Sequence, residues 1–257
     1  MSGCGCGACG RIPCCDVFEE GRAVLVTGFP AGPWGANCFV LASGEGSECI
    51  LIDPGMDCEA GIAEILSKHH LRPSAVLLTH GHLDHTWSVA PVADGYGIPA
   101  YIHPSDREQL TNPLAGISPE TQMMMSNLSP DSLPHVEPDD VRDLSDGLEL
   151  DLAGIKLTVD EVPGHTPGSV VFRCFGDGTI PPLMFSGDFL FAGSIGRTDL
   201  PGGDHQAMLR SLASVVLSQR DEMVVLPGHG PQTTIGQERA TNPFLAGMTA
   251  EPAGPTL

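Results

Sequence analysis

The stretch Thr79-His-Gly-His-Leu-Asp-His85 follows directly on the apolar run Ala75-Val-Leu-Leu78. The apolar run is typical of a buried strand, so the polar residues lie at the end of that strand. In an extended segment alternate side chains point to the same side, which allows His80 and His82 to reach one ion. The aspartate and the last histidine come where the chain turns into the next helix, so they point elsewhere. The loop is therefore predicted to serve two adjacent metal ions.

Three further polar segments follow predicted strands in the same way. They are Pro163-Gly-His-Thr-Pro-Gly168, Ser186-Gly-Asp188 and Leu226-Pro-Gly-His-Gly230. A lone histidine in a glycine turn is more often a hydrogen-bonded loop residue, but these segments occur together with the histidine loop. Imidazole and carboxylate groups are common ligands of transition ions in proteins. The sequence therefore predicts a two-metal site with these ligands: His80, His82, His85, His165, His229, Asp84 and Asp188.

The chain of 257 residues has the length of one large α/β domain. Helical patterns are predicted before residue 70, after the histidine loop and at 206–217, and residues 105–140 are predicted as an irregular insertion with one or two short helices. We place the domain at 21–244, between a Cys/Gly-rich disordered head at 1–20 and a flexible tail at 245–257. Two sheets with helices outside would suit the order of elements. Strands are predicted at 23–27, 38–41, 49–52, 75–78, 100–102, 156–162, 170–174, 183–185 and 223–226.

Charge and hydropathy exclude several classes of partner. The formal charge of −20 repels a phosphate backbone, so we expect no nucleic-acid partner. No apolar run approaches the roughly 20 residues that span a bilayer, so we expect no membrane insertion. The N-terminus has no charged start followed by an apolar segment, which argues against a secretory signal and predicts a cytoplasmic location. Nothing in the sequence indicates an oligomeric state.

The nine cysteines fall into two groups. Four are scattered among apolar residues and are predicted to be buried free thiols in a reducing compartment: Cys38, Cys49, Cys58 and Cys174. The other five lie in the glycine-rich head, at Cys4, Cys6, Cys9, Cys14 and Cys15. Their spacing matches no four-ligand pattern well, so an oxidisable head is the favoured interpretation, with a metal or redox site as the alternative.

Together the seven predicted ligands resemble the signature of the metallo-β-lactamase superfamily, and the similarity runs from about residue 24 to residue 244. The resemblance implies a four-layered αββα sandwich, in agreement with the two sheets predicted above. It implies one metal held by His80, His82 and His165, and a second held by Asp84, His85 and His229. Asp188 would bridge the two ions. Asp53 matches an acid of the family that supports the ligands without binding metal, and its alternative role is that of a plain turn aspartate.

Such a pair of ions is suited to hydrolysis. Two ions roughly 3.5–4 Å apart share a water and lower its pKa from about 15.7 toward ~7, which yields a bridging hydroxide at neutral pH. The expected cofactors are two divalent ions, with zinc as the first choice and iron or manganese as the alternatives. Among the ligands, Asp84 and Asp188 are the expected catalytic residues.

The segment Gly187–Asp199 is similar to the glyoxalase II branch, which hydrolyses S-acyl thiol conjugates such as lactoylglutathione. In that branch a cation at the position of Arg197 binds the carboxylate of the thiol, a role that suits a guanidinium. The alternative role of Arg197 is that of a surface or ion-paired arginine. The aromatic residue that follows this cation in the branch is absent, since Thr198 and Asp199 stand there, so the identity of the thiol is left open.

The resemblance also leaves a rival activity. The same Gly-Arg-Thr-Asp segment resembles persulfide dioxygenases, which bind one iron through His80, His165 and Asp188 by position. A true β-lactamase is disfavoured because Asp188 and this segment are not expected together in that class. A lactonase of the superfamily would have a tyrosine three residues past the bridging acid, where this chain has Phe191. A nuclease is disfavoured because the negative charge of the chain repels nucleic acid. We therefore expect a metal-dependent hydrolase of small thioesters, with a mononuclear iron persulfide dioxygenase as the alternative.

Overall fold

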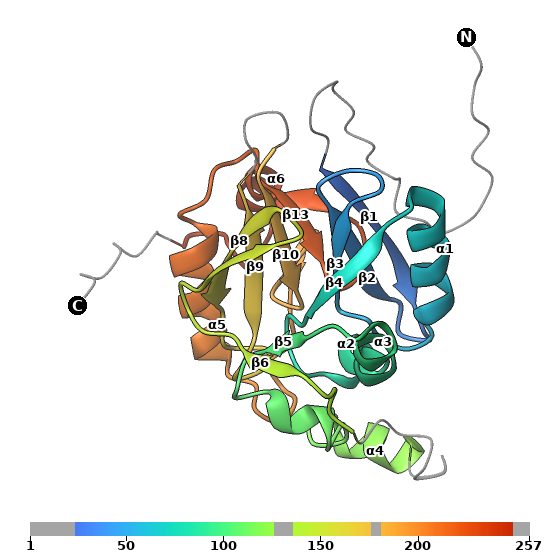
Figure 1. Ribbon diagram of the computed structural model, residues 1–257. Coiled ribbons are helices and arrows are strands. Elements are labelled where there is room, and N and C mark those ends of the chain that lie inside the picture. Colours follow the sequence, from blue (N-terminus) through green and yellow to red (C-terminus); the bar gives the residue numbers. More distant parts are fainter. Residues whose placement is uncertain (1–23, 126–135, 176–180, 249–257) are drawn as a thin grey trace, which may run out of the picture.

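The computed structural model describes residues 24–125, 136–175 and 181–248, and shows two sheets packed face to face with helices on both outer faces (Figure 1). The predicted head at 1–20 and residues 249–257 of the predicted tail lie outside the described residues. The described residues include the predicted domain, 21–244, apart from its first three residues and two internal gaps.

The first sheet is antiparallel over its first three strands and parallel over the rest. Parallel neighbours need a crossover connection, and the helices of this half supply it. Those helices are α1 (Glu59–His69), α2 (Leu83–Thr86), α3 (Val89–Tyr96) and α4 (Pro119–Met125), with a 3-10 turn at Arg107–Leu110. In order across the sheet, the strands are β1 (Leu25–Ala31), β2 (Ala36–Ala42), β3 (Glu48–Ile52), β4 (Arg72–Leu77), β5 (Ala100–Ile102) and β6 (Val141–Asp143).

The second sheet is covered on its outer face by two helices (Figure 1). They are α5 (His205–Ser211), continued by a π-helical turn at Leu212–Val216, and α6 (Ile235–Thr241). A separate small hairpin joins β11 (Leu190–Phe191) and β12 (Ser194–Ile195). In order across the sheet, the strands are β14 (Thr233–Thr234), β13 (Val224–Pro227), β10 (Leu183–Gly187), β9 (Val170–Cys174), β8 (Ile155–Glu161) and β7 (Glu149–Leu152).

Side chains alternate between two buried faces along β2. Cys38 and Val40 pack toward α1 and α3, whereas Phe39 and Leu41 pack against the second sheet. Strands that are buried on both faces read as continuous apolar runs, because neither set of alternate residues meets water. This explains why the sequence shows short apolar runs here in place of an apolar–polar alternation.

Three apolar layers separate the four structural layers. One lies between the first sheet and its helices, one between the two sheets, and one between the second sheet and α5. The middle layer contains Phe172 and Phe185 from the second sheet, facing Phe39 from the first. The predicted αββα sandwich is therefore confirmed.

The two sheets are also joined by hydrogen bonds at the end where their polar loops meet. The backbone N–H of Val170 donates to the carbonyl of Thr79 at 2.8 Å, and that of Asn37 donates to the carbonyl of Gly228 at 2.7 Å. The side-chain amide of Asn37 donates to the carbonyl of Pro227 at 2.9 Å. These bonds fix the loops after β4, β8 and β13 relative to one another.

Candidate metal centre

The seven predicted ligands come together at this edge of the sandwich. Each follows a strand, as predicted: the histidine loop follows β4, His165 follows β8, Asp188 follows β10 and His229 follows β13. Their nitrogen and oxygen atoms form overlapping groups in which every atom lies within 4.8 Å of the others. The groups are His80–His82–His165, His80–His85–Asp188 and Asp84–His85–His229.

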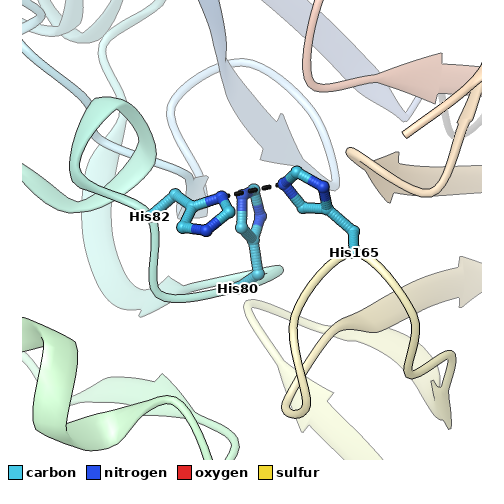
Figure 2. A group of neighbouring side chains, drawn as sticks. All are labelled: His80, His82 and His165. Atoms are coloured by element: carbon cyan, nitrogen blue, oxygen red, sulfur yellow. Dashed lines mark hydrogen bonds between the residues drawn. The ribbon is translucent and has the colours of Figure 1, made fainter. Parts of the chain in front are cut away.

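The rings of His80, His82 and His165 point toward one another (Figure 2). His82 Nδ1 lies 2.8 Å from His165 Nε2, and His80 Nε2 is buried without a hydrogen-bond partner. All three side chains are almost inaccessible to solvent. A buried polar atom without a partner costs about 1–3 kcal/mol, a cost that a bound cation would remove. The group therefore fits a metal ion.

Hydrogen bonds outside the group fix two of these rings. Thr79 Oγ1 donates its proton to Asp53 Oδ2 at 2.7 Å, so His80 Nδ1, 3.1 Å from Thr79 Oγ1, must be the donor in that contact. His165 Nδ1 donates to the carbonyl of Arg197 at 2.8 Å. In both histidines Nε2 is then left as a lone pair that faces the group, which is the form that binds a metal.

A second group forms around His85. His85 Nε2 lies 3.6 Å from Asp84 Oδ2 and 3.3 Å from His229 Nε2, and Asp84 Oδ2 lies 3.1 Å from His229 Nε2. His85 Nδ1 is 3.1 Å from Asp53 Oδ2. Since an ionised carboxylate can only accept a hydrogen bond, Nδ1 is the donor in this contact, and Nε2 is the ring nitrogen that faces the second group. The second group thus presents two imidazoles and a carboxylate.

Asp188 lies between the two groups. Its Oδ2 is 3.6 Å from His165 Nε2 on one side and 3.6 Å from His229 Nε2 on the other. Its Oδ1 is 3.4 Å from His85 Nε2 and is buried without a hydrogen-bond partner. A carboxylate in this position has an oxygen for each of two neighbouring cations.

The pKa values of His80 and His82 in the first group suit neutral metal-binding imidazoles. Burial, and then repulsion by His85 and His165, hold the pKa of His80 well below its usual value. Burial, and then repulsion by His165, lower the pKa of His82 to about 3. Imidazole must be neutral to bind a metal, so neither ring has to lose a proton at neutral pH.

The second group and Asp188 carry charge when no metal is bound. Burial alone would raise the pKa of Asp84 and of Asp188, but attraction to His85, His229 and other nearby histidines together outweighs it and holds both below the usual value. Burial alone would lower the pKa of His85, but Asp84, Asp188 and Asp53 together outweigh it and raise this pKa well above the usual value. The pKa of His229 is raised in the same way, chiefly by its hydrogen bond with Asp84. A metal ion would therefore displace protons here.

Asp53 lies behind the ligands and does not belong to any of the three groups. It is buried and accepts a hydrogen bond from the backbone N–H of Thr79 at 2.8 Å, besides its contacts with Thr79 Oγ1 and His85. Its backbone is left-handed, with φ of 52°, a conformation that is uncommon for residues other than glycine. Such an outlier persists only where its surroundings fix it, and the geometry supports the predicted supporting role over a plain turn.

Asp106 is a fully buried acid that the sequence reasoning missed. Its Oδ2 accepts from the N–H of Gly81 at 2.8 Å and from the Thr166 hydroxyl at 2.6 Å, and its Oδ1 accepts from the N–H of Gly168 at 2.8 Å. It therefore holds the loops of His82 and His165 together. A signal was present, because Asp106 also follows a predicted strand, at 100–102.

An open pocket leads to the metal-binding groups. Arg197 lies on its wall, but its guanidinium is paired with Asp199, with Nε 2.7 Å from Oδ1 and Nη2 2.8 Å from Oδ2. The lining residues are Trp34, His82, Leu83, Asp84, Ile117, Ser118, Thr121, His165, Asp188, Arg197, Leu200 and His229.

Residues 31–229 match the model of the metallo-beta-lactamase superfamily, a span that holds all seven predicted ligands. This chain belongs to that superfamily. Membership makes it an enzyme of the metal-dependent hydrolase type, and members typically bind two divalent metals, for which the His-rich groups are the candidate sites.

Two relatives align with most of this chain. An uncharacterized protein of Mycobacterium tuberculosis (strain ATCC 25618 / H37Rv) is 46% identical over 228 residues, which cover 88% of this chain and all of the relative. The hydroxyacylglutathione hydrolase GloC of Haemophilus influenzae is 33% identical over 219 residues, which cover 84% of this chain and 95% of the relative.

Two solved structures share both fold and sequence with this chain. The BLEG-1 B3 metallo-beta-lactamase is 38% identical with a TM-score of 0.73, covering 87% of this chain and all of that chain. TTHA1623, solved in a di-iron-bound form, is 38% identical with a TM-score of 0.68, covering 84% of this chain and 98% of that chain. Of these similarities, the one to the hydroxyacylglutathione hydrolase GloC is consistent with a glyoxalase II-like member of the superfamily.

Proposed function

We propose that this protein hydrolyses thioesters of small thiols at a centre of two divalent metal ions, with zinc as the first choice and iron or manganese as the alternatives. The observation that carries the proposal is the position of Asp188, 3.6 Å from both His165 Nε2 and His229 Nε2. A carboxylate between two histidine groups can contact two ions. The two groups together offer more ligands than a single ion needs. GloC, a hydroxyacylglutathione hydrolase, supports the thioester as the substrate.

Each residue of the centre would have a defined task. His80, His82 and His165 would hold one ion, Asp84, His85 and His229 the other, and Asp188 would contact both. When bound, the ions lower the pKa of a shared water toward about 7 and polarise the carbonyl under attack. Asp53 would keep His85 oriented through Nδ1, and the carbonyl of Arg197 would keep His165 oriented in the same way.

The remaining parts of the proposal follow from the pocket and from the described helices. The pocket suits a small molecule, and the predicted binding of a substrate carboxylate by Arg197 stays a prediction because Asp199 occupies that guanidinium. The described helices are too short or too polar to span a bilayer. A cytoplasmic location, supported by four free buried cysteines, is part of the proposal.

The test combines metal analysis with three assays on the purified protein. We expect two metal ions per chain and turnover of lactoylglutathione or another S-lactoyl thioester. A β-lactam such as nitrocefin is the second substrate, since BLEG-1 is a B3 metallo-beta-lactamase, and glutathione persulfide with an oxygen electrode is the third. One iron per chain with oxygen consumption, or β-lactam cleavage without thioester cleavage, would overturn the proposal.

Two variants separate the hydrolase from the mononuclear iron alternative. The alternative needs His80, His165 and Asp188, so His229→Ala and Asp84→Asn would leave its three ligands in place. The proposed hydrolase needs both groups, so either variant should lower kcat by about 100-fold or more while one metal per chain remains. Asp188→Ala should abolish both activities and serves as the matched control.

A further inference from the structure

His82 differs from three of the other histidines in its outer ring nitrogen, the one that points away from the metal-binding groups. In those three the outer nitrogen is Nδ1 and has a partner. The pairs are His80 with Thr79 Oγ1, His165 with the carbonyl of Arg197, and His85 with Asp53. His82 presents Nδ1 to its group, so its outer nitrogen is Nε2, which is buried without a partner. Metal-binding histidines almost always donate their outer N–H to a carboxylate, a carbonyl or a water.

A buried acceptor without a partner is found at the same place. Among the described residues, four buried side-chain atoms have no hydrogen-bond partner. Two of them, His80 Nε2 and Asp188 Oδ1, belong to the metal-binding groups. The other two are His82 Nε2 and Gln109 Oε1. Buried polar groups in proteins are nearly always paired, so these two atoms need an explanation of their own.

The side chain of Gln109 meets the outer edge of the His82 ring. Gln109 lies on the 3-10 turn Arg107–Leu110. A Cβ added to Gly116 would overlap Gln109 Oε1 and would lie 2.7 Å from His82 Cδ2, so these two atoms are neighbours. In an imidazole ring the Cδ2–Nε2 edge lies opposite Nδ1. The edge of His82 that faces away from the metal-binding group is therefore the edge next to the amide oxygen of Gln109.

The other end of the amide supports this orientation of Gln109. A Cβ added to Gly81 would lie 2.9 Å from Gln109 Nε2 and 2.8 Å from the carbonyl oxygen of Asp106. The amide nitrogen, which can only donate, is thus on the side of a backbone carbonyl, which can only accept. The amide oxygen is left on the side of His82.

The position of one proton explains why His82 and Gln109 are not paired with each other. His165 donates from Nδ1, so its Nε2 is a lone pair, and the 2.8 Å contact with it requires the proton of His82 to be on Nδ1. A neutral imidazole has one such proton, so His82 Nε2 is then a second lone pair, next to the lone pairs of Gln109 Oε1. A cation at Nδ1 requires the proton on Nε2, which makes Nε2 a donor beside an acceptor.

We propose that Gln109 is a positioning residue of the metal centre, whose Oε1 accepts a hydrogen bond from His82 Nε2–H when Nδ1 binds an ion. Gln109 then stabilises the tautomer of His82 that binds metal. This proposal rests on the proposed metal centre and does not depend on a thioester as the substrate. Because the bond requires the proton on Nε2, Gln109 contributes to metal affinity and not to the stability of the metal-free protein.

Metal affinity, measured by chelator competition, is the first test. Gln109→Met keeps the length of the side chain and removes the acceptor, so we expect it to weaken zinc binding about tenfold or more. Gln109→Glu keeps an acceptor and should bind zinc at least as tightly as the wild type. The matched control is Gln237→Met, at an exposed glutamine of α6 that donates to Thr241 Oγ1 at 3.1 Å, and it should not change the affinity.

The position of the proton is the second test, by NMR of the ¹⁵N-labelled, zinc-loaded protein. The ring proton of His82 should be on Nε2 and should exchange slowly with water in the wild type and in Gln109→Glu. In Gln109→Met its signal should move upfield and exchange faster, because the N–H has lost its acceptor. A proton on Nδ1 in the wild type, or the same signal in Gln109→Met, would overturn the proposal.

Thermal unfolding separates this role from a purely structural one. With a chelator present, Gln109→Met should unfold at the wild-type temperature or above it, because the variant removes a buried acceptor that has no partner. With zinc present, it should unfold below the wild type. The same loss of Tm in both conditions would mean that Gln109 supports only the fold, and would overturn the proposal.

These measurements also keep the proposal distinct from the proposed function. If zinc affinity and the His82 signal change as expected but no thioester is hydrolysed, thioester hydrolysis fails and the role of Gln109 holds. If thioesters are hydrolysed and Gln109→Met binds zinc as tightly as the wild type, the role of Gln109 fails alone.

Discussion

Asp106 supports the site without belonging to any of the metal-binding groups. Replacing it by alanine would leave the N–H groups of Gly81 and Gly168 buried without an acceptor, and the Thr166 hydroxyl with Ser169 Oγ as its remaining partner. Each such loss costs about 1–3 kcal/mol. We expect Asp106→Ala to lower the free energy of unfolding by about 3 kcal/mol and the Tm by about 10 °C, and to weaken metal binding.

The control for this variant is Asp146→Asn, at an exposed carboxylate that accepts from the N–H of Glu161 at 3.0 Å. It should cost less than about 0.5 kcal/mol in thermal unfolding. If Asp106→Ala unfolds at the temperature of this control, and holds its metal as tightly in a chelator competition, Asp106 does not support the site.

Gly228 is required by the close approach of the chain to Asp188. A Cβ on this residue would lie 2.3 Å from Asp188 Oδ1 and 2.7 Å from His85 Cε1, so an alanine has to push both side chains aside. We expect Gly228→Ala to lose at least one metal ion per chain, measured by elemental analysis after dialysis. Gly95→Ala, in α3, meets no atom within 4 Å and should keep the full metal content.

The residues that the sequence could reveal are those that stand close together in it or share a motif. His80 to His85 form one loop, and the later ligands each follow an apolar strand, so their convergence was predictable. Asp106 accepts from residues 25 to 62 positions away, a contact that no local pattern encodes. The role of Arg197 was left open between binding a substrate carboxylate and being a surface or ion-paired arginine. A spacing of two residues permits the contact with Asp199 without requiring it.

At the scale of elements, strands buried on both faces were predictable and short edge elements were not. β2 and β3 read as apolar runs, whereas β6, β7, β14 and the hairpin β11–β12 have two to four residues each and were missed. The helix predicted at 206–217 is α5 followed by a π-helical turn, and α6 was missed although Thr234 caps it by accepting from the N–H of Gln237. That threonine followed by a glutamine three residues later is a helix-start signal.

The buried strands also carry a chemical prediction. The described thiols are free and buried as predicted, and burial, with the charge of Glu48 as a smaller cause, raises the pKa of Cys49 to about 12. A hydrogen bond with Cys58 and burial raise the pKa of Cys38. Alkylation needs the thiolate, so a raised pKa means slow reaction at pH 8.

We expect iodoacetamide at pH 8 to leave these two cysteines unmodified in the native protein and to modify them fully in guanidinium chloride, as measured by mass spectrometry of peptides. Native labelling of Cys49 at the denatured rate would contradict the buried position of β3.

At the scale of the whole molecule, the metal-binding groups lie between the two sheets. The first sheet supplies the loop after β4, and the second supplies His165, Asp188 and His229, so a bound ion would link the two halves. A ligand that binds only the folded state stabilises it by about 2.7 kcal/mol at 100 times its Kd. We expect chelation to lower the Tm of the wild type by several degrees, and Asp188→Ala to show a smaller shift in the same calorimetric scan. Equal shifts would show that the chelated metal is not bound at this centre.

We expect seven ligands far apart in the chain to hold a pair of ions on either side of Asp188. Anomalous diffraction from a crystal of the metal-loaded protein measures this directly. We predict two peaks roughly 3.5–4 Å apart, one bonded to His80, His82 and His165 and the other to Asp84, His85 and His229, with an oxygen of Asp188 bonded to each. A single peak bonded to His80, His165 and Asp188 would contradict the account.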